Sequence, residues 1–157
     1  MNDLSARLQT DLKEAVRSGD RTRRDVIRFL RADIHNVEIE RGHALSDGEI
    51  TDVIMRQIKQ RRDSIEQFAR GGRQDLVDAE QGQIAVLETY LPPQLTPSEV
   101  LEFAREVVAE SGASGLGDLG RVIPMLRERL GPRAAGNVVA QAARTALTEQ
   151  RDEANAS

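Results

Sequence analysis

The sequence predicts an all-α protein, with a four-helix domain at the N-terminus followed by a smaller three-helix domain. Two observations support this fold class. Aromatic residues make up only 3% of the 157 residues and tryptophan is absent, which suits helices packed through Leu, Ile, Val and Ala better than a β-sheet. Apolar residues also recur at spacings of three and four along most of the chain, which is the period of a helix with one buried face.

The first two predicted helices cover residues 3–18 and about 21–40. Asp20 is a typical N-cap for the second helix, and Gly42 lies where that helix should end. Because the connection is short, we expect the two helices to pack antiparallel through their apolar stripes. These stripes consist of Leu4, Leu8, Leu12, Ala15 and Val16 in the first helix and of Ile27, Leu30, Ile34 and Val37 in the second.

Ser46 and Glu49 form a capping-box pattern that opens the longest predicted helix, which ends at 71–72, a pair of glycines. A fourth helix is predicted over about 75–91, with Gly82 weakening its middle by about 1 kcal/mol relative to Ala. The inward side chains of these two helices are Ile50, Val53, Ile54, Ile58, Ile65, Phe68, Leu76, Ile84, Leu87 and Leu91.

Pro92 and Pro93 mark the predicted boundary between the two domains, which we place at 1–92 and 96–150. Two consecutive prolines cannot continue a helix, and each pushes the residue before it towards extended geometry. A second capping box follows at once, because Thr96-Pro97-Ser98-Glu99 has Pro at the first helical position. The sequence therefore predicts that each domain folds on its own.

The second domain is predicted to contain helices over about 96–110, 118–130 and 135–150. A glycine-rich loop at 112–117 joins the first two helices, and it lacks the spacing of a nucleotide-binding loop. Residues 151–157 are polar and are predicted to form a frayed tail.

Several classes of site and location are not indicated by the sequence. There is no cysteine, so a disulfide framework, a Cys-based zinc site and a thiol nucleophile are excluded. His35 and His43, the two histidines, have no metal-binding spacing, and no nucleophile motif is present, so we predict no catalytic residue, no metal and no cofactor. Without a signal-peptide pattern or a long apolar run, we expect a cytoplasmic protein.

Rows of arginines are the most suggestive feature of the first domain. Arg24, Arg28 and Arg31 follow one another at i, i+4 and i+7, so they lie on one side of the second helix and could contact phosphates together. A second cluster on the long helix and the following turn includes Arg62 and Arg73. The alternative is a solvated face in which nearby carboxylates pair with these arginines.

A smaller basic segment lies in the second domain. Between residues 112 and 145, five arginines stand against two acidic residues, a net charge of +3 in a chain whose net charge is −4. Arg121 and Arg133 are the candidate phosphate contacts. The predicted helix start at 135–137, which includes Asn137, offers free backbone N–H groups beside Arg133. Structural capping by Arg133 is the competing interpretation.

Five motifs in order resemble the YqeY (GatB/YqeY) family. Two lie on the long helix and the following turn, one lies at the boundary between the domains, and two lie in the second domain. They are Arg61-Arg62-Asp63-Ser64-Ile65-Glu66-Gln67-Phe68, Gly72-Arg73-Gln74-Asp75-Leu76-Val77, Tyr90-Leu91-Pro92-Pro93-Gln94-Leu95, Leu119-Gly120-Arg121-Val122-Ile123 and Gly131-Pro132-Arg133-Ala134-Ala135-Gly136-Asn137-Val138-Val139. The family usually has Asp where Ala135 stands here, so a role of that carboxylate does not carry over.

The resemblance implies a helical N-terminal domain and a three-helix domain similar to the tail of the GatB subunit of glutamine-dependent tRNA amidotransferases. It therefore suggests a tRNA-associated accessory protein whose partners are tRNA and the amidotransferase or aminoacyl-tRNA machinery. We expect it to contact RNA through the second domain, by Arg121 and Arg133, with the arginine rows of the first domain as a second surface. Two alternatives remain open: a non-catalytic component of a carbon–nitrogen ligase complex with glutamine as amido-N-donor, and a helical protein–protein interaction module. The catalytic domains of the amidotransferase are absent from this short chain.

Overall fold

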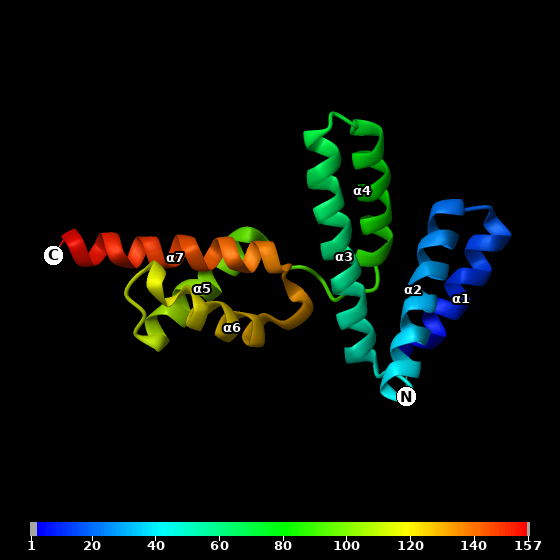
Figure 1. The fold of residues 1–157 in the computed structure, drawn as a ribbon. Coiled ribbons are helices and arrows are strands. Elements are labelled where there is room, and N and C mark those ends of the chain that lie inside the picture. Colours follow the sequence, from blue (N-terminus) through cyan, green and yellow to red (C-terminus); the bar gives the residue numbers. More distant parts are fainter. Residues whose placement is uncertain (1–2, 157) are drawn as a thin grey trace. The chain divides into compact units, whose positions relative to one another are not determined.

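The computed structural model describes residues 3–156, and over that range it consists of seven α-helices and two short 3₁₀ turns, without a strand (Figure 1). The chain separates into two compact units, one ending at Leu91 and the other beginning at Pro92. In chain order the elements are α1 (Asp3–Ser18), α2 (Arg21–Arg41), α3 (Asp47–Arg70), α4 (Gln74–Glu88), α5 (Pro97–Ser111), η1 (Leu116–Asp118), α6 (Leu119–Leu130), η2 (Gly131–Arg133) and α7 (Gly136–Ala156). The predicted all-helical class is confirmed.

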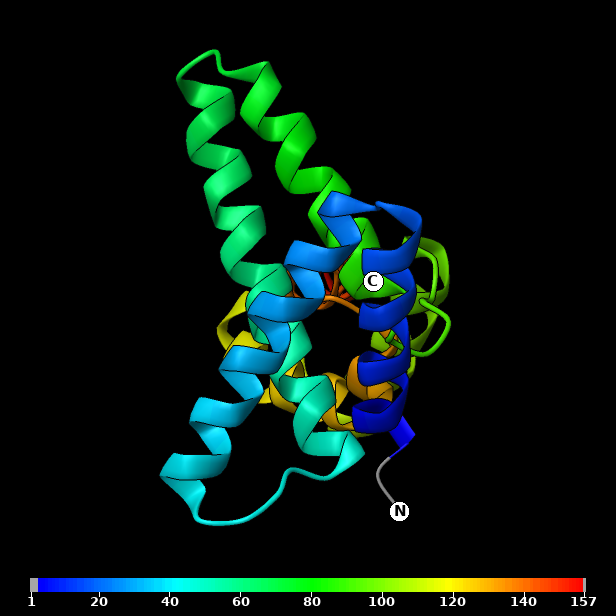
Figure 2. The ribbon, with the colours of Figure 1, turned by 90° about the vertical axis from the view of Figure 1, so that its right-hand side faces the viewer.

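The first unit contains two helical hairpins, α1 with α2 and α3 with α4. Helix α2 packs against α3 and α4 as well as against α1, so the four helices share one core. The turn between α3 and α4 projects beyond α1 and α2, as the view turned by 90° also shows (Figures 1 and 2).

Short polar side chains fix the helix ends of this unit. The carboxylate of Asp20 accepts the Arg23 N–H at 3.1 Å, which confirms Asp20 as the N-cap of α2, and Gly42 ends the helix in the left-handed conformation with a φ of 76°. Asp47 accepts the N–H of Leu4 at 3.2 Å and so ties the start of α1 to the start of α3. The Ser46–Glu49 capping box is present.

The core of the first unit comes mostly from the predicted apolar stripes, except that Val16 is 52% exposed and that Leu45, which lies outside the stripes, is buried. Its fully buried aliphatic side chains include Leu8, Ile27, Leu30, Leu45, Ile50, Ile54 and Leu87. One buried polar residue was not predicted: Gln57 of α3 is only 1% exposed, and its amide donates to Asp33 of α2 at 2.9 Å. Burying an amide is favourable only where it finds such a partner.

The second unit is a three-helix structure around its own core. The Thr96–Glu99 capping box opens α5 as predicted, with Pro97 at the first turn. Pro124 lies inside α6, where it cannot donate the backbone hydrogen bond that an α-helix would otherwise make to Gly120. The core consists mainly of Val100, Ala104, Val107, Val108, Val122, Leu126, Leu130, Val139, Ala143, Ala146 and Leu147.

Two helix ends differ from the prediction. Helix α4 ends at Glu88, and residues 89–91 form tighter turns. Leu91 precedes Pro92, and the residue before a proline disfavours the helical conformation. The sequence predicts a frayed tail over 151–157, whereas residues 151–156 continue α7 to Ala156. Fraying of this segment stays a prediction. This segment holds Ala, Glu and Arg and no Gly or Pro, so nothing in it stops the helix; residue 157 lies outside the described range. The ability of each predicted domain to fold alone stays a prediction.

Candidate nucleic-acid interface

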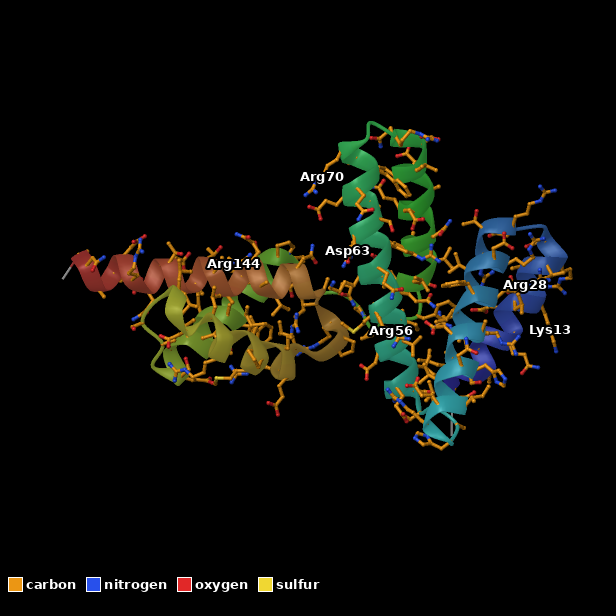
Figure 3. The ribbon with its side chains drawn as sticks, viewed as in Figure 1. Lys13, Arg28, Arg56, Asp63, Arg70 and Arg144 are labelled. Atoms are coloured by element: carbon orange, nitrogen blue, oxygen red, sulfur yellow. The ribbon has the colours of Figure 1, made fainter. Side chains whose placement is uncertain are left out.

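Helix α2 presents a row of exposed arginines beside its buried stripe. Arg28 and Arg31 are exposed, and neither makes an ion pair or a hydrogen bond with any described residue. Lys13 of α1 has no such partner either, and Figure 3 shows Lys13 and Arg28 on the side of the hairpin that faces away from α3 and α4. These cations are therefore available to an anion from solution.

The charge of the hairpin is concentrated in one segment. Between residues 13 and 31 there are seven basic and three acidic residues, which gives a net charge of +4 in a chain whose net charge is −4. The remaining residues up to 91 carry eight basic and fourteen acidic side chains, a net charge of −6. The α1–α2 hairpin is thus a local basic surface on an otherwise acidic unit, and such a surface attracts polyanions locally.

Arg24, the third member of the predicted row, is engaged in an ion pair. Its Nε donates to the Asp25 carboxylate at 2.9 Å. This hydrogen bond holds the pKa of Asp25 below its ordinary value, and the charges of Arg28 and Arg21 act in the same direction. Arg28 and Arg21 make no ion pair with Asp25, so of these three arginines only Arg24 is held by this carboxylate.

The second predicted cluster, on α3 and the following turn, is neutralised. Arg73 donates two hydrogen bonds to the Asp75 carboxylate, at 3.1 and 3.0 Å, and this pairing lowers the pKa of Asp75. Arg62 lies 3.5 Å from Glu88. For Arg62 and Arg73 the structure therefore matches the alternative of a solvated, salt-bridged face, and no phosphate contact needs to be assigned to them.

In the second unit the two candidate arginines make intramolecular contacts. Arg133 donates to the carbonyl oxygens of Leu130 and Arg129, each at 3.1 Å, and its guanidinium lies 5.6 Å from the centre of the Phe103 ring. Arg121 donates to the Ser111 carbonyl at 2.9 Å. Arg133 thus caps the end of α6, as the competing interpretation holds.

The start of α7 is formed by the residues that the sequence indicated, but another arginine lies against it. Asn137 is exposed in the first turn of α7, next to Gly136. A Cβ atom built on Gly136 would lie 3.2 Å from the Nη2 of Arg127, so the glycine lets this guanidinium approach the helix. The sequence reasoning missed Arg127, because only the packing of α6 against α7 brings it there.

A buried polar group at the end of the first unit was also missed. The Tyr90 hydroxyl donates to the Asp11 carboxylate at 2.5 Å, and Arg23 lies 3.4 Å from the same carboxylate. Arg7 stacks over the Tyr90 ring at 4.6 Å. Burial, together with the Asp11 hydrogen bond and charge, raises the pKa of Tyr90 well above its ordinary value. The group links α1, α2 and the end of α4, which is a structural role.

Metal-binding clusters and membrane-spanning helices are both absent from the described residues. No group of three or more His, Asp or Glu side chains within residues 3–156 is placed to hold a metal ion. Over the same part of the chain, no helix is long and apolar enough to cross a membrane. A shallow groove of about 310 Å³ lies between α1 and α2 and is lined by Ser5, Leu8, Arg31, Ala32, Ile34, His35 and Glu38.

Fold and surface together define an all-helical protein with one exposed basic hairpin and no metal-binding cluster among its described residues. The family model of the Yqey-like proteins matches residues 5–147. The chain therefore belongs to the YqeY family, which confirms the resemblance that its five sequence motifs carry.

Relatives of the chain include fungal proteins named Altered inheritance of mitochondria protein 41, mitochondrial. The protein of Pyrenophora tritici-repentis is 34% identical over 133 residues, which are 82% of this chain and 74% of the relative. Those of Lachancea thermotolerans and Saccharomyces cerevisiae are 39% identical over 90 residues and 34% identical over 101 residues. These matches cover 57% and 64% of this chain, and 48% and 54% of the relatives, so the chain spans about half the length of the last two proteins.

These relatives are named as mitochondrial proteins. A cytoplasmic location of this chain is expected from its sequence, and the relatives give that expectation no support. The cytoplasmic location stays a prediction.

Proposed function

We propose that this chain is a tRNA-associated accessory protein that holds RNA phosphates on its α1–α2 hairpin. The observation that carries the proposal is the pair of exposed guanidiniums, Arg28 and Arg31, without a partner among the described residues, within a segment of net charge +4. Phosphate contacts of this kind release counterions, so they supply affinity without depending on sequence.

The choice of tRNA rests on the family resemblance, because the tail of the related amidotransferase subunit helps to bind tRNA. The geometry supports the hairpin more strongly than the second unit as the place of contact. Arg121 and Arg133 already donate to backbone carbonyls, so a phosphate would have to compete with those hydrogen bonds. Arg28 and Arg31 have no such bonds to give up.

The proposal is tested by filter binding of the full chain to total tRNA over a series of salt concentrations. We expect affinity to fall linearly with the logarithm of the salt concentration. In the double variant Arg28→Ala with Arg31→Ala, the slope should decrease by roughly one to two units, since each lost phosphate contact removes about 0.7–0.9. A wild-type chain that binds no tRNA at low salt would refute the proposal.

A matched control is available on the same unit. Arg62 and Arg73 are also arginines of the predicted set, yet each is paired with a carboxylate. The double variant Arg62→Ala with Arg73→Ala removes the same formal charge from the chain. It should leave the salt slope unchanged, because no phosphate contact is lost.

A further inference from the structure

His35 of α2 continues the row of arginines on this helix. It stands four residues after Arg31 and seven after Arg28, and at these spacings side chains lie on the same side of a helix. An exposed histidine on a helix is by itself no sign of a binding site. His35 is distinguished by the groove that it shares with an unpaired cation.

Arg31 and His35 meet in the groove of about 310 Å³ between α1 and α2. Both residues line this groove, and both are exposed. Neither makes a hydrogen bond or an ion pair with any residue in the part of the chain that the structure describes. Helical residues four positions apart have their Cβ atoms about 5–6 Å from each other. The two side chains can therefore reach the same anion.

Few other charged groups face His35 in this groove. Helix α1 contributes Ser5 and Leu8 to the lining, and neither carries a charge. Helix α2 contributes Glu38 in addition to the guanidinium, and the Glu38 carboxylate accepts the backbone N–H of Leu45 at 2.9 Å. The one acidic side chain of the lining is therefore held by the loop after α2 and is not paired with His35.

The protonation state of a histidine decides whether it can bind a phosphate. A protonated imidazole carries a positive charge and two N–H donors, whereas the neutral ring keeps one nitrogen as an acceptor, which repels a phosphate oxygen. Histidine side chains as a class change their charge between about pH 5 and 8. A phosphate held by a guanidinium beside a histidine thus gains a second cationic contact only at the acidic end of this range.

We propose that His35 is a phosphate-binding residue, and that its protonated imidazole holds the same RNA phosphate as Arg31 in the α1–α2 groove. Arg28 does not line the groove, so it contacts a different phosphate. This inference rests on the proposed function and goes beyond it, because it makes the binding of RNA tighter as the pH falls. Each additional cationic contact with a phosphate also releases counterions and steepens the salt dependence.

The test is filter binding of the full chain to total tRNA at about pH 5.5 and about pH 7.5, each over a salt series. We expect the wild type to bind at least about threefold more tightly at the lower pH, with a salt slope larger by about 0.7–0.9. His35→Asn, whose amide is never charged, should bind equally at both pH values. His35→Lys, which is charged at both, should keep roughly the affinity of the acidic wild type at the higher pH.

The chain offers a matched control, because it contains one other histidine. His43 lies outside the lining of the groove, with its Nδ1 3.0 Å from the carbonyl oxygen of Ala44. His43→Asn should keep the pH dependence of the wild type. Of the two unpaired arginines, Arg31→Ala should reduce the pH dependence, because the shared phosphate is lost, and Arg28→Ala should keep it.

The failure of this inference can be told apart from the failure of the proposed function. A wild type with the same affinity at both pH values refutes the role of His35, and so does a pH dependence that persists in His35→Asn. If Arg28→Ala with Arg31→Ala still lowers the salt slope in that case, the proposed function survives. A wild-type chain that binds no tRNA at either pH refutes both proposals. Circular dichroism of each variant at both pH values confirms that its helices are intact.

Discussion

The two basic segments of this chain have similar net charges but different availability. Residues 13–31 carry a net charge of +4 and residues 112–145 a net charge of +3. In the first segment Arg28 and Arg31 have no ion pair or hydrogen bond with a described residue, whereas in the second Arg121 and Arg133 donate to backbone carbonyls. A count of charges along the sequence therefore does not show which cations can receive a ligand.

The two segments differ in how the carbonyl oxygens at their helix ends receive hydrogen bonds. Helix α2 ends in a left-handed glycine whose N–H donates to the Glu38 carbonyl, so no arginine is needed there. Helix α6 ends at Leu130 before a proline-containing turn, and there the Arg133 side chain donates to the carbonyls of Leu130 and Arg129. The position of an arginine near a helix end is thus consistent with a structural role as well as with a ligand contact.

The largest expected effect is on the free energy of unfolding, and it compares a buried residue of α2 with two exposed ones. Leu30 is fully buried in the core of the first unit, so Leu30→Ala should lower the free energy of unfolding by about 2–5 kcal/mol. Arg28→Ala with Arg31→Ala should change it by less than about 0.5 kcal/mol. Urea unfolding followed by circular dichroism measures both. A marked destabilisation by the arginine variant would show that these arginines belong to the fold.

The second effect concerns the capping role of Arg133. Arg133→Ala removes two hydrogen bonds from a charged donor to carbonyl oxygens, and we expect it to lower the free energy of unfolding by about 1–2 kcal/mol. Arg144→Ala is the matched control, because the guanidinium of Arg144 is exposed on α7 and makes no hydrogen bond or ion pair with a described residue. Equal stability of the two variants in thermal unfolding would contradict the capping role.

A smaller effect depends on pH and concerns Tyr90. Because the pKa of Tyr90 is raised in the folded chain, its contribution is fully present below the ordinary tyrosine value of 10.0 and is lost as the pH rises above that value. The wild type should therefore lose stability between roughly pH 9.5 and 11. Tyr90→Phe should be about 1 kcal/mol less stable at neutral pH and should lose less over that interval. Parallel pH curves would argue against the Tyr90–Asp11 hydrogen bond.

The smallest effect compares the two capping boxes. Hydrogen bonds from the N-cap residue lower the pKa of Glu49 and of Glu99, so both stabilise the fold above their ordinary value of 4.5 and lose that contribution as the pH falls below it. Glu49 also accepts a hydrogen bond from Arg41 at 2.6 Å. Glu49→Gln should therefore reduce the loss of stability between pH 7 and pH 3.5 more than Glu99→Gln does. Thermal unfolding at both pH values checks the order.

Much of the fold could be predicted because its signals are local. The caps at Asp20, Ser46 and Thr96 and the helical period of the apolar residues depend only on neighbours in the sequence. The extension of α7 to Ala156 goes beyond the predicted end of the helix, because the polar composition of this segment favours a frayed end although no residue in it breaks a helix.

The candidate site was less predictable, because pairing is a tertiary property. The spacing of Arg28 and Arg31 shows that they share a side of α2, but only the fold shows that no carboxylate reaches them. The exposure of Phe29, whose side chain is 59% exposed on α2, was not predicted either. A sequence signal did exist: Phe29 lies outside the stripe formed by Ile27, Leu30 and Ile34.

The most direct test of the central claim compares two double variants in the same tRNA titration. Arg28→Ala with Arg31→Ala removes the two unpaired cations, and Arg121→Ala with Arg133→Ala removes the two that donate to backbone carbonyls. Measured over a salt series, the first pair should weaken tRNA binding on the order of tenfold and lower the salt slope by roughly one to two units, while the second leaves the slope unchanged. The reverse order would contradict the assignment of the interface to the α1–α2 hairpin.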